Sequence, residues 1–263
     1  MKNPLAPEWL IAPPDLNAID ARIWPRTAKR NSYGELTIGD VSVSALMRQY
    51  GSPLYVVDQE DFETRLLFIK RAFSDAANKI GTTAKLYYAS KSLLTSEVVR
   101  WVVDAGLSVD VSTGGELAVA LAAGAKGERL GLHGNNKSLV EISKAIASDI
   151  GAIVIDSELE IERIAAVALS QGKTQPVRLR VNSGVHAHTH EHLATAREDQ
   201  KFGVALSDVP DLVEKIRSHS HLRFLGLHSH IGSQIFVVDG FVAAAERLLD
   251  VHAQLLKSGD VPE

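Results

Sequence analysis

The 263-residue chain contains no cysteine, which excludes a disulfide framework, a thiolate metal site and a cysteine nucleophile within it. It also lacks any apolar run close to the roughly 20 residues that a membrane span requires. The first residues are interrupted by Pro4, Pro7, Pro13 and Pro14, so they lack the continuous apolar core of a signal peptide. We therefore expect a cytoplasmic protein that does not bind a membrane.

Clustered positive charge is missing as well. The formal net charge is −4, and lysine and arginine are scattered, which gives no electrostatic footprint for nucleic acid. Hydrophobic residues make up 45% of the chain and charged residues 23%, a composition typical of a globular protein with a large core. The composition therefore predicts a protein that acts on a small molecule, with no nucleic-acid partner.

After residue 50 the chain alternates between apolar runs, typical of buried strands, and amphipathic runs, typical of helices. SPLYVVD, residues 52–58, is the first predicted strand. Six more are predicted after residue 80: AKLYYASK, LSVDVS, RLGLHG, AIVIDS, VRLRVN and FLGLHSHIG. Three helical runs end at a glycine that suits a left-handed helix end: Gly106, Gly124 and Gly172. This order of strands and helices indicates βαβ units and a parallel sheet.

Such a sheet closes in one of two ways, as an open doubly wound sheet or as a (β/α)8 barrel. The open sheet usually carries a G-x-G-x-x-G fingerprint, which is absent here. Polar residues instead follow the strands: Lys91, Asp110, Ser112, His133, Asn135, Asp156, Asn182, His228 and His230. In a barrel these ends converge on one mouth. We predict an α/β fold of the (β/α)8 TIM-barrel type, apparently truncated after about six strands.

Lys91 stands two residues after the apolar run LYYA, between Ser90 and Ser92. A lysine at a strand end commonly extends its amine into water. The alternative is an amine held for chemistry. If Tyr87 or Tyr88 and nearby apolar groups desolvate it, its pKa falls and it can form a Schiff base, as lysines that bind pyridoxal phosphate do. The run alone leaves both interpretations open.

The stretch GLHSHIGSQ places His228 and His230 on one face of a strand, followed by a turn at Gly232 and Ser233. The backbone N–H groups and the hydroxyl of such a turn can meet a phosphate. The simpler interpretation is a pair of histidines packed at a strand end.

Four histidines alternate in VHAHTHEH: His186, His188, His190 and His192. On a strand they would share one face, and imidazole is a common zinc ligand. The segment is nevertheless polar and lies in a long connection, whereas a catalytic zinc needs ligands from a rigid frame. We predict no metal site here.

The stretch DVSTGGELAVALAAG places Asp110 at a strand end and Glu116 in the first turn of a helix. An acidic residue in a first turn is explained by the helix dipole alone. Asp110 is left without such an explanation.

Taken together, these stretches resemble diaminopimelate decarboxylase, a family of fold-type III pyridoxal phosphate enzymes built from a (β/α)8 barrel and a β-domain. The resemblance runs from about residue 52 to 241 and rests on motifs in the family's order: SPLYVVD, YYASKS, DVSTGGELAVALAAG, LHGNNKS, VRLRVN, HTHEHLATAREDQKFG and GLHSHIGSQI. It implies pyridoxal 5'-phosphate as the cofactor and decarboxylation of meso-diaminopimelate to L-lysine, the last step of lysine biosynthesis.

The resemblance also implies roles for individual residues. Lys91 would be the Schiff-base lysine, and His230 would stack on the cofactor ring. Gly232 and Ser233 would lie toward the phosphate, with Asp110 and Glu116 near the cofactor. Two further matches carry no assigned role: Arg180 and Lys201–Gly203.

The family's glycine-rich phosphate loop, its acid cysteine and its substrate-binding arginines find no match, so we expect the chain to be a fragment that is itself inactive. Residues 1–50 would be an N-terminal segment that packs on the missing β-domain, and residues 51–263 a partial barrel. A complete protein would be a homodimer with an amino-acid substrate. The alternatives are decarboxylation of ornithine, arginine or carboxynorspermidine, a pyridoxal-binding barrel without decarboxylase activity, and a zinc hydrolase that uses the four histidines.

Overall fold

The structure is a computed structural model that describes residues 7, 9, 15, 17–185, 202–233, 235–257 and 259. The chain forms two compact units, Met1–Thr83 and Ala84–Glu263. The predicted packing of residues 1–50 on a separate β-domain stays a prediction.

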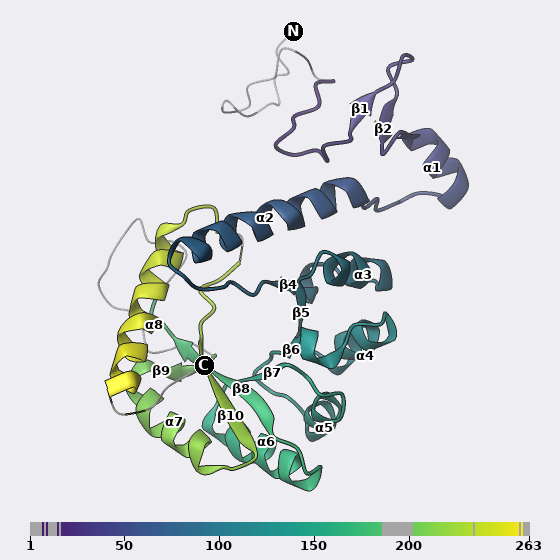
Figure 1. The fold of residues 1–263 in the computed structure, drawn as a ribbon. Coiled ribbons are helices and arrows are strands. Elements are labelled where there is room, and N and C mark those ends of the chain that lie inside the picture. Colours follow the sequence, from purple (N-terminus) through teal and green to yellow (C-terminus); the bar gives the residue numbers. More distant parts are fainter. Residues whose placement is uncertain are drawn as a thin grey trace. The chain divides into compact units, whose positions relative to one another are not determined.

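The first unit contains a small antiparallel sheet and two helices (Figure 1). Its elements are β1 (Lys29–Arg30), β2 (Leu36–Ile38), β3 (Val41–Ser42), α1 (Val43–Tyr50) and α2 (Gln59–Lys79). Helix α2 begins where the Asp58 side chain accepts the backbone N–H of Asp61 at 3.1 Å. The strand predicted over residues 52–58 is wrong: this stretch is coil, and no strand in the described part of the chain pairs with its backbone.

The second unit is built on a parallel sheet whose strand order follows the chain. The six strands are β4 (Tyr87–Ala89), β5 (Ser108–Val111), β6 (Leu130–Leu132), β7 (Ala152–Ile155), β8 (Gln175–Asn182) and β10 (Leu222–His228). They coincide with the six strands predicted after residue 80. A two-residue strand, β9 (Val204–Ala205), pairs with the end of β8.

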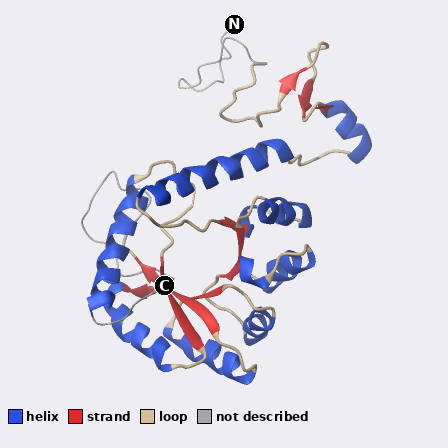
Figure 2. Ribbon diagram, viewed as in Figure 1, coloured by secondary structure: helices blue, strands red, loops and turns tan. Residues whose placement is uncertain are grey.

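Helices cover the outer side of this sheet (Figure 2). They are α3 (Ser96–Asp104), α4 (Gly114–Ala122), α5 (Leu139–Ala147), α6 (Glu158–Ser170), α7 (Val209–Ser218) and α8 (Asp239–Lys257), with 3-10 turns η1 (Ser90–Ser92), η2 (Gly127–Arg129) and η3 (Leu206–Asp208). The three glycines predicted at helix ends have φ values of 79°, 96° and 63°, which confirms their left-handed conformation. None of the helices that the structure describes is both long and apolar enough to cross a membrane.

The sheet is strongly curved. The ring of His133, after β6, lies 4.7 Å from the ring of His228, at the end of β10, although β7 and β8 separate these strands. In a flat sheet three strand spacings would keep them roughly 14 Å apart. The two side chains therefore meet across a concave inner face, which is the curvature of a barrel wall.

The core lies between this wall and its helices. Strands β6 and β7 are buried along their whole length, as expected for parallel strands covered on both faces. In β8, buried and half-buried residues alternate, so Val177, Leu179 and Val181 pack on one face while Arg178 and Arg180 occupy the other. The carboxyl ends of all six strands share one edge, where the polar residues predicted from the sequence lie.

Candidate active site

The turn after β4 presents Lys91. The Ser92 hydroxyl donates to the carbonyl of Ala89 at 2.8 Å, and the Tyr88 hydroxyl donates to the carbonyl of Leu93 at the same distance. These bonds fix the 3-10 turn η1, from which the Lys91 side chain extends into solvent. Lys91 is exposed here, so the structure does not show the desolvation by Tyr87 or Tyr88 that the Schiff-base interpretation requires, and the role of Lys91 stays a prediction.

Asp110, in β5, lies against His133, which directly follows β6. The distance from His133 Nε2 to Asp110 Oδ1 is 2.5 Å. Room for this contact comes from Gly131, where an added Cβ would stand 3.3 Å from Asp110 Oδ1. This contact gives a structural reason for a carboxylate at the end of β5, which the sequence left unexplained.

His228 completes this cluster from the other side of the curved sheet. Burial, with a smaller contribution from the neighbouring His133, lowers the pKa of His228 to about 3. Its Nδ1 is buried and has no hydrogen-bond partner among the described residues. At neutral pH His228 is therefore an uncharged imidazole with a free polar atom.

We expect His228 to make the fold sensitive to acid. Its pKa is about 3 in the folded state and 6.5 ordinarily, so between these values the unfolded chain binds more protons. His228 therefore does not reduce the free energy of unfolding well above pH 6.5. Below that pH the free energy of unfolding falls by up to about 1.4 kcal/mol per pH unit. Urea unfolding at pH 7 and pH 5 should show about 2 kcal/mol of loss from this group. Between pH 7 and pH 5, the free energy of unfolding of His228→Asn should fall by about 2 kcal/mol less than that of the parent. An equal fall in both proteins would contradict the assignment.

His230 follows two residues after His228 and is exposed. Its pKa is lowered by desolvation first and by the positive charge of Lys91 second, while Asp110 opposes the shift. Lys91 follows β4 and His230 follows β10, the two outermost strands of the path, yet the charge of Lys91 acts on the ring of His230. The structure thus brings Lys91, Asp110 and His230 together at the mouth.

The other predicted site residues are placed as follows. Glu116, in the first turn of α4, accepts the N–H of Ser112 at 2.7 Å, so its carboxylate closes the helix start. Its predicted place near a cofactor stays a prediction. Gly232 has a φ of 131°, a conformation that favours glycine, and Ser233 beside it is exposed. The roles predicted for both at a phosphate also stay predictions.

The four alternating histidines and Lys201 lie outside the described residues, so the zinc interpretation is untested. Within residues 17–185 and the later described segments, no group of three histidine, aspartate or glutamate side chains is placed to hold a metal ion.

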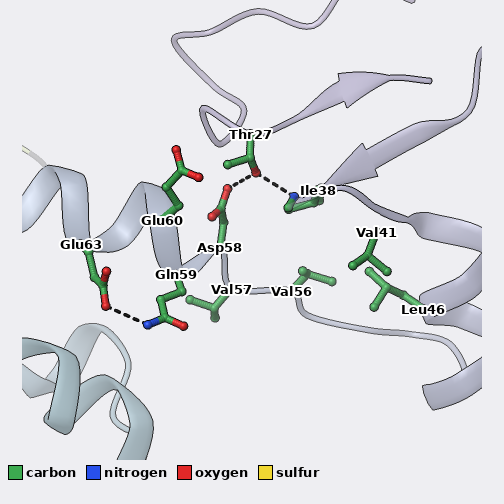
Figure 3. Close-up of a pocket in the computed structure, with 11 residues that line it drawn as sticks. Thr27, Ile38, Val41, Leu46, Val56, Val57, Asp58, Gln59, Glu60 and Glu63 are labelled. Atoms are coloured by element: carbon green, nitrogen blue, oxygen red, sulfur yellow. Dashed lines mark hydrogen bonds between the residues drawn. The ribbon is translucent and has the colours of Figure 1, made fainter. Parts of the chain in front are cut away.

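A pocket of about 460 Å³ in the first unit offers a different surface (Figure 3). Apolar side chains line it together with acidic and polar ones: Thr27, Ile38, Gly39, Val41, Leu46, Val56, Val57, Asp58, Gln59, Glu60 and Glu63. The Thr27 hydroxyl donates to Asp58, and the Gln59 amide donates to Glu63. The pocket contains no lysine or histidine, so the amine and imidazole chemistry belongs to the strand ends.

The strand ends also hold buried polar atoms without a hydrogen bond in the described chain: Ser90 Oγ, Asp110 Oδ1, His228 Nδ1 and Ser229 Oγ. Buried polar groups are normally hydrogen-bonded, so these atoms suit a polar ligand. An exposed amine that can bind an aldehyde and an exposed neutral imidazole that can lie on a ring complete the set. These residues fit pyridoxal phosphate.

The sequence model of a family described as pyridoxal-dependent decarboxylase, pyridoxal binding domain, matches residues 66–261. The chain belongs to this family. Pyridoxal phosphate, inferred above from motifs, is thereby confirmed as the cofactor.

Curated relatives agree with this assignment. The chain is 46% identical over 229 residues to the diaminopimelate decarboxylase of Mycobacterium tuberculosis, covering 86% of this chain and 50% of the relative. It is 41% identical over 224 residues to that of Bacillus subtilis, covering 84% and 50%. The predicted resemblance is therefore confirmed. The chain spans about half the length of the curated relatives it matches.

Solved structures confirm the fold. A diaminopimelate decarboxylase from M. jannaschii superimposes with a TM-score of 0.81 at 26% identity, covering 89% of this chain and 54% of that one. The same enzyme in complex with L-lysine gives 0.80 at 25% identity, covering 91% and 55%. The predicted fold class, a barrel of the pyridoxal phosphate decarboxylases, is confirmed.

Sequence reasoning gave no role to His133. It was recognised only as a strand-end residue, whereas the structure shows it between Asp110 and His228. The available signal was its position directly after β6, next to the strand that carries Asp110.

Proposed function

We propose that the full-length protein uses pyridoxal phosphate to remove the carboxylate at the D-centre of meso-diaminopimelate, which gives L-lysine and carbon dioxide. The observation that carries this proposal is that Lys91 and His230 both stand at the carboxyl edge of the curved sheet, in a chain 46% identical to a diaminopimelate decarboxylase. The L-lysine bound to the M. jannaschii enzyme supports the product.

Lys91 would hold the cofactor covalently. Its amine extends from the middle residue of the turn η1 and is exposed to whatever enters the mouth. When bound, pyridoxal phosphate supplies an electron sink for the electrons left behind by departing carbon dioxide. Lys91 would also return its amine to the cofactor once the product leaves.

His230 would lie against one face of the cofactor ring. Desolvation and the nearby Lys91 ammonium lower its pKa, so at neutral pH it offers an uncharged ring for stacking. Asp110 and His133 would lie together beside it, since only 2.5 Å separates Asp110 Oδ1 from His133 Nε2.

The direct test is carbon dioxide release by the full-length protein from meso-diaminopimelate, ornithine, arginine and carboxynorspermidine, each with pyridoxal phosphate. We expect release from meso-diaminopimelate, with L-lysine as the product. Preference for another substrate would assign the protein to a different decarboxylase activity. Cofactor binding without release from any substrate would support a non-decarboxylating barrel, and stoichiometric zinc without cofactor would support the hydrolase alternative.

A homodimer and a cytoplasmic location belong to the same proposal. Light scattering of the full-length protein tests the first, and a monomer with full activity would contradict it. Cell fractionation tests the second.

Replacement of His230 by alanine should weaken cofactor binding about fivefold, because a ring contact of this kind contributes about 1 kcal/mol, and should lower kcat. His221→Ala is the matched control. His221 lies at the opposite end of β10, where its Nδ1 contacts the carbonyl of Lys173 at 3.1 Å. A titration of the cofactor, followed by absorbance, measures both variants. Equal losses would show that the effect does not come from the mouth.

A further inference from the structure

Lys137 and Glu160 form a buried ion pair that the proposed chemistry does not use. Lys137 Nζ lies 2.7 Å from Glu160 Oε2, and the side chains are only 2% and 3% exposed. Burial of two charges is costly, and an apolar pair of similar volume is often as stable. Stability alone therefore does not explain the pair.

The pair connects the ends of two neighbouring strands. Lys137 Nζ donates to the carbonyl of Gly134 at 2.5 Å, and Gly134 directly follows His133. Glu160 Oε2 accepts the backbone N–H of Asp156, just after β7, at 2.8 Å. The loops that follow β6 and β7 are thus tied to one buried ammonium and one buried carboxylate.

The connection continues to β8. Asp156 Oδ1 accepts from Arg180 Nη1 at 3.0 Å, and the side chains are 6% and 14% exposed. The Arg180 guanidinium also lies over the ring of Phe202, 4.8 Å from its centroid. Arg180 lies on the face of β8 opposite the buried Leu179 and Val181. From that face its positive charge also lowers the pKa of both His228 and His230.

Two other ion pairs of this unit are much more exposed. Lys173 and Asp149, at the amino-terminal edge of the sheet, are 2.6 Å apart but 32% and 80% exposed. Lys215 and Glu158 are 32% and 63% exposed. Water screens such pairs, so they exert little control over neighbouring groups.

We infer that Lys137 and Glu160 are positioning residues: their buried pair holds His133 and, through Asp156, Arg180 in the arrangement that receives the cofactor and substrate. Neither side chain touches the reacting groups. The inference rests on the proposed function, because it assigns the pair to that same site.

The test replaces both charges while keeping the shape, with Lys137→Met and Glu160→Gln in one full-length protein. The glutamine can still accept the N–H of Asp156, so the melting temperature should lie within about 4 °C of the parent. Lys137→Met alone leaves a buried carboxylate unpaired and should lower the melting temperature by roughly 6–20 °C. The double variant should nevertheless bind pyridoxal phosphate about tenfold more weakly and lose about tenfold in kcat, with KM little changed, as expected when supporting contacts are lost.

Lys173→Met is the matched control, because it removes an ion pair and two carbonyl contacts at the other edge of the sheet. It should lower the melting temperature without changing cofactor affinity. If the double variant does not fold, Glu160→Gln alone replaces it in the test. Glu160→Gln should weaken cofactor binding at least threefold. Parental cofactor affinity and kcat in a stable double variant, or in Glu160→Gln where the double variant does not fold, would overturn the inference. A parent protein that binds no pyridoxal phosphate would instead overturn the proposed function, and the inference with it.

Discussion

Replacement of Lys91 by alanine is expected to lower turnover of the full-length protein by at least about 10³-fold, equivalent to about 4 kcal/mol of barrier. The reason is that the amine would be the group that holds the cofactor and exchanges with the substrate, and Lys91 lies in the turn at the carboxyl end of β4. The fold should be retained, because the side chain is exposed and the turn is fixed by Ser92 and Tyr88. Far-ultraviolet circular dichroism and the decarboxylation assay together measure this.

Lys85 provides the matched control for Lys91. It lies just before the other end of the same strand, exposed, with Nζ 5.3 Å from the ring centroid of Tyr87. Lys85→Ala should therefore leave turnover within about twofold of the parent, as is usual for a surface substitution. Borohydride reduction followed by peptide mapping gives an independent readout, with the pyridoxyl label expected on Lys91. A label on Lys85, or turnover retained by Lys91→Ala, would remove Lys91 from the proposed role.

The order of the strands could be predicted from the sequence because a helix follows each of the six strands, and β6 and β7 are buried along their whole length. Burial of this kind produces short apolar runs such as AIVI at 152–155, where all residues are buried. Helix ends are similarly local: the Ser138 side chain accepts from Glu141, and the Glu141 side chain binds back at Ser138, a capping box within four residues.

Features that depend on distant partners could not be predicted. The apolar run at 52–58 has the composition of a strand, but a strand also needs a neighbour, and composition does not reveal one. Lys137 and Glu160 are 23 positions apart, and nothing in LHGNNKS or DSELE indicates that their side chains meet in the core. The contact of His133 with His228 likewise depends on the curvature of the whole sheet.

Replacement of Gly127 by alanine is expected to destabilise the protein by about 3 kcal/mol or more, because overpacking against backbone is at the upper end of such costs. Gly127 opens the turn η2 that leads into β6, and its carbonyl accepts the N–H of Gly151 at 2.9 Å. A Cβ at this position would stand 1.8 Å from the carbonyl oxygen of Ser148 and 2.8 Å from that of Asp149. Both are backbone atoms, so one of the two chain segments has to move.

Gly115, in the first turn of α4, is the matched control for this change. An added Cβ there meets only the Thr113 hydroxyl oxygen, at 3.8 Å, and alanine is the better helix former by roughly 0.5–1 kcal/mol. Gly115→Ala should therefore be neutral or slightly stabilising. A urea titration measures the free energy of unfolding of both variants. The displaced segment leads into β6, whose far end carries His133, so Gly127→Ala should also weaken pyridoxal phosphate binding. Stability equal to the parent in Gly127→Ala would mean that the close approach of η2 to the loop before β7 is not required for this sheet to form.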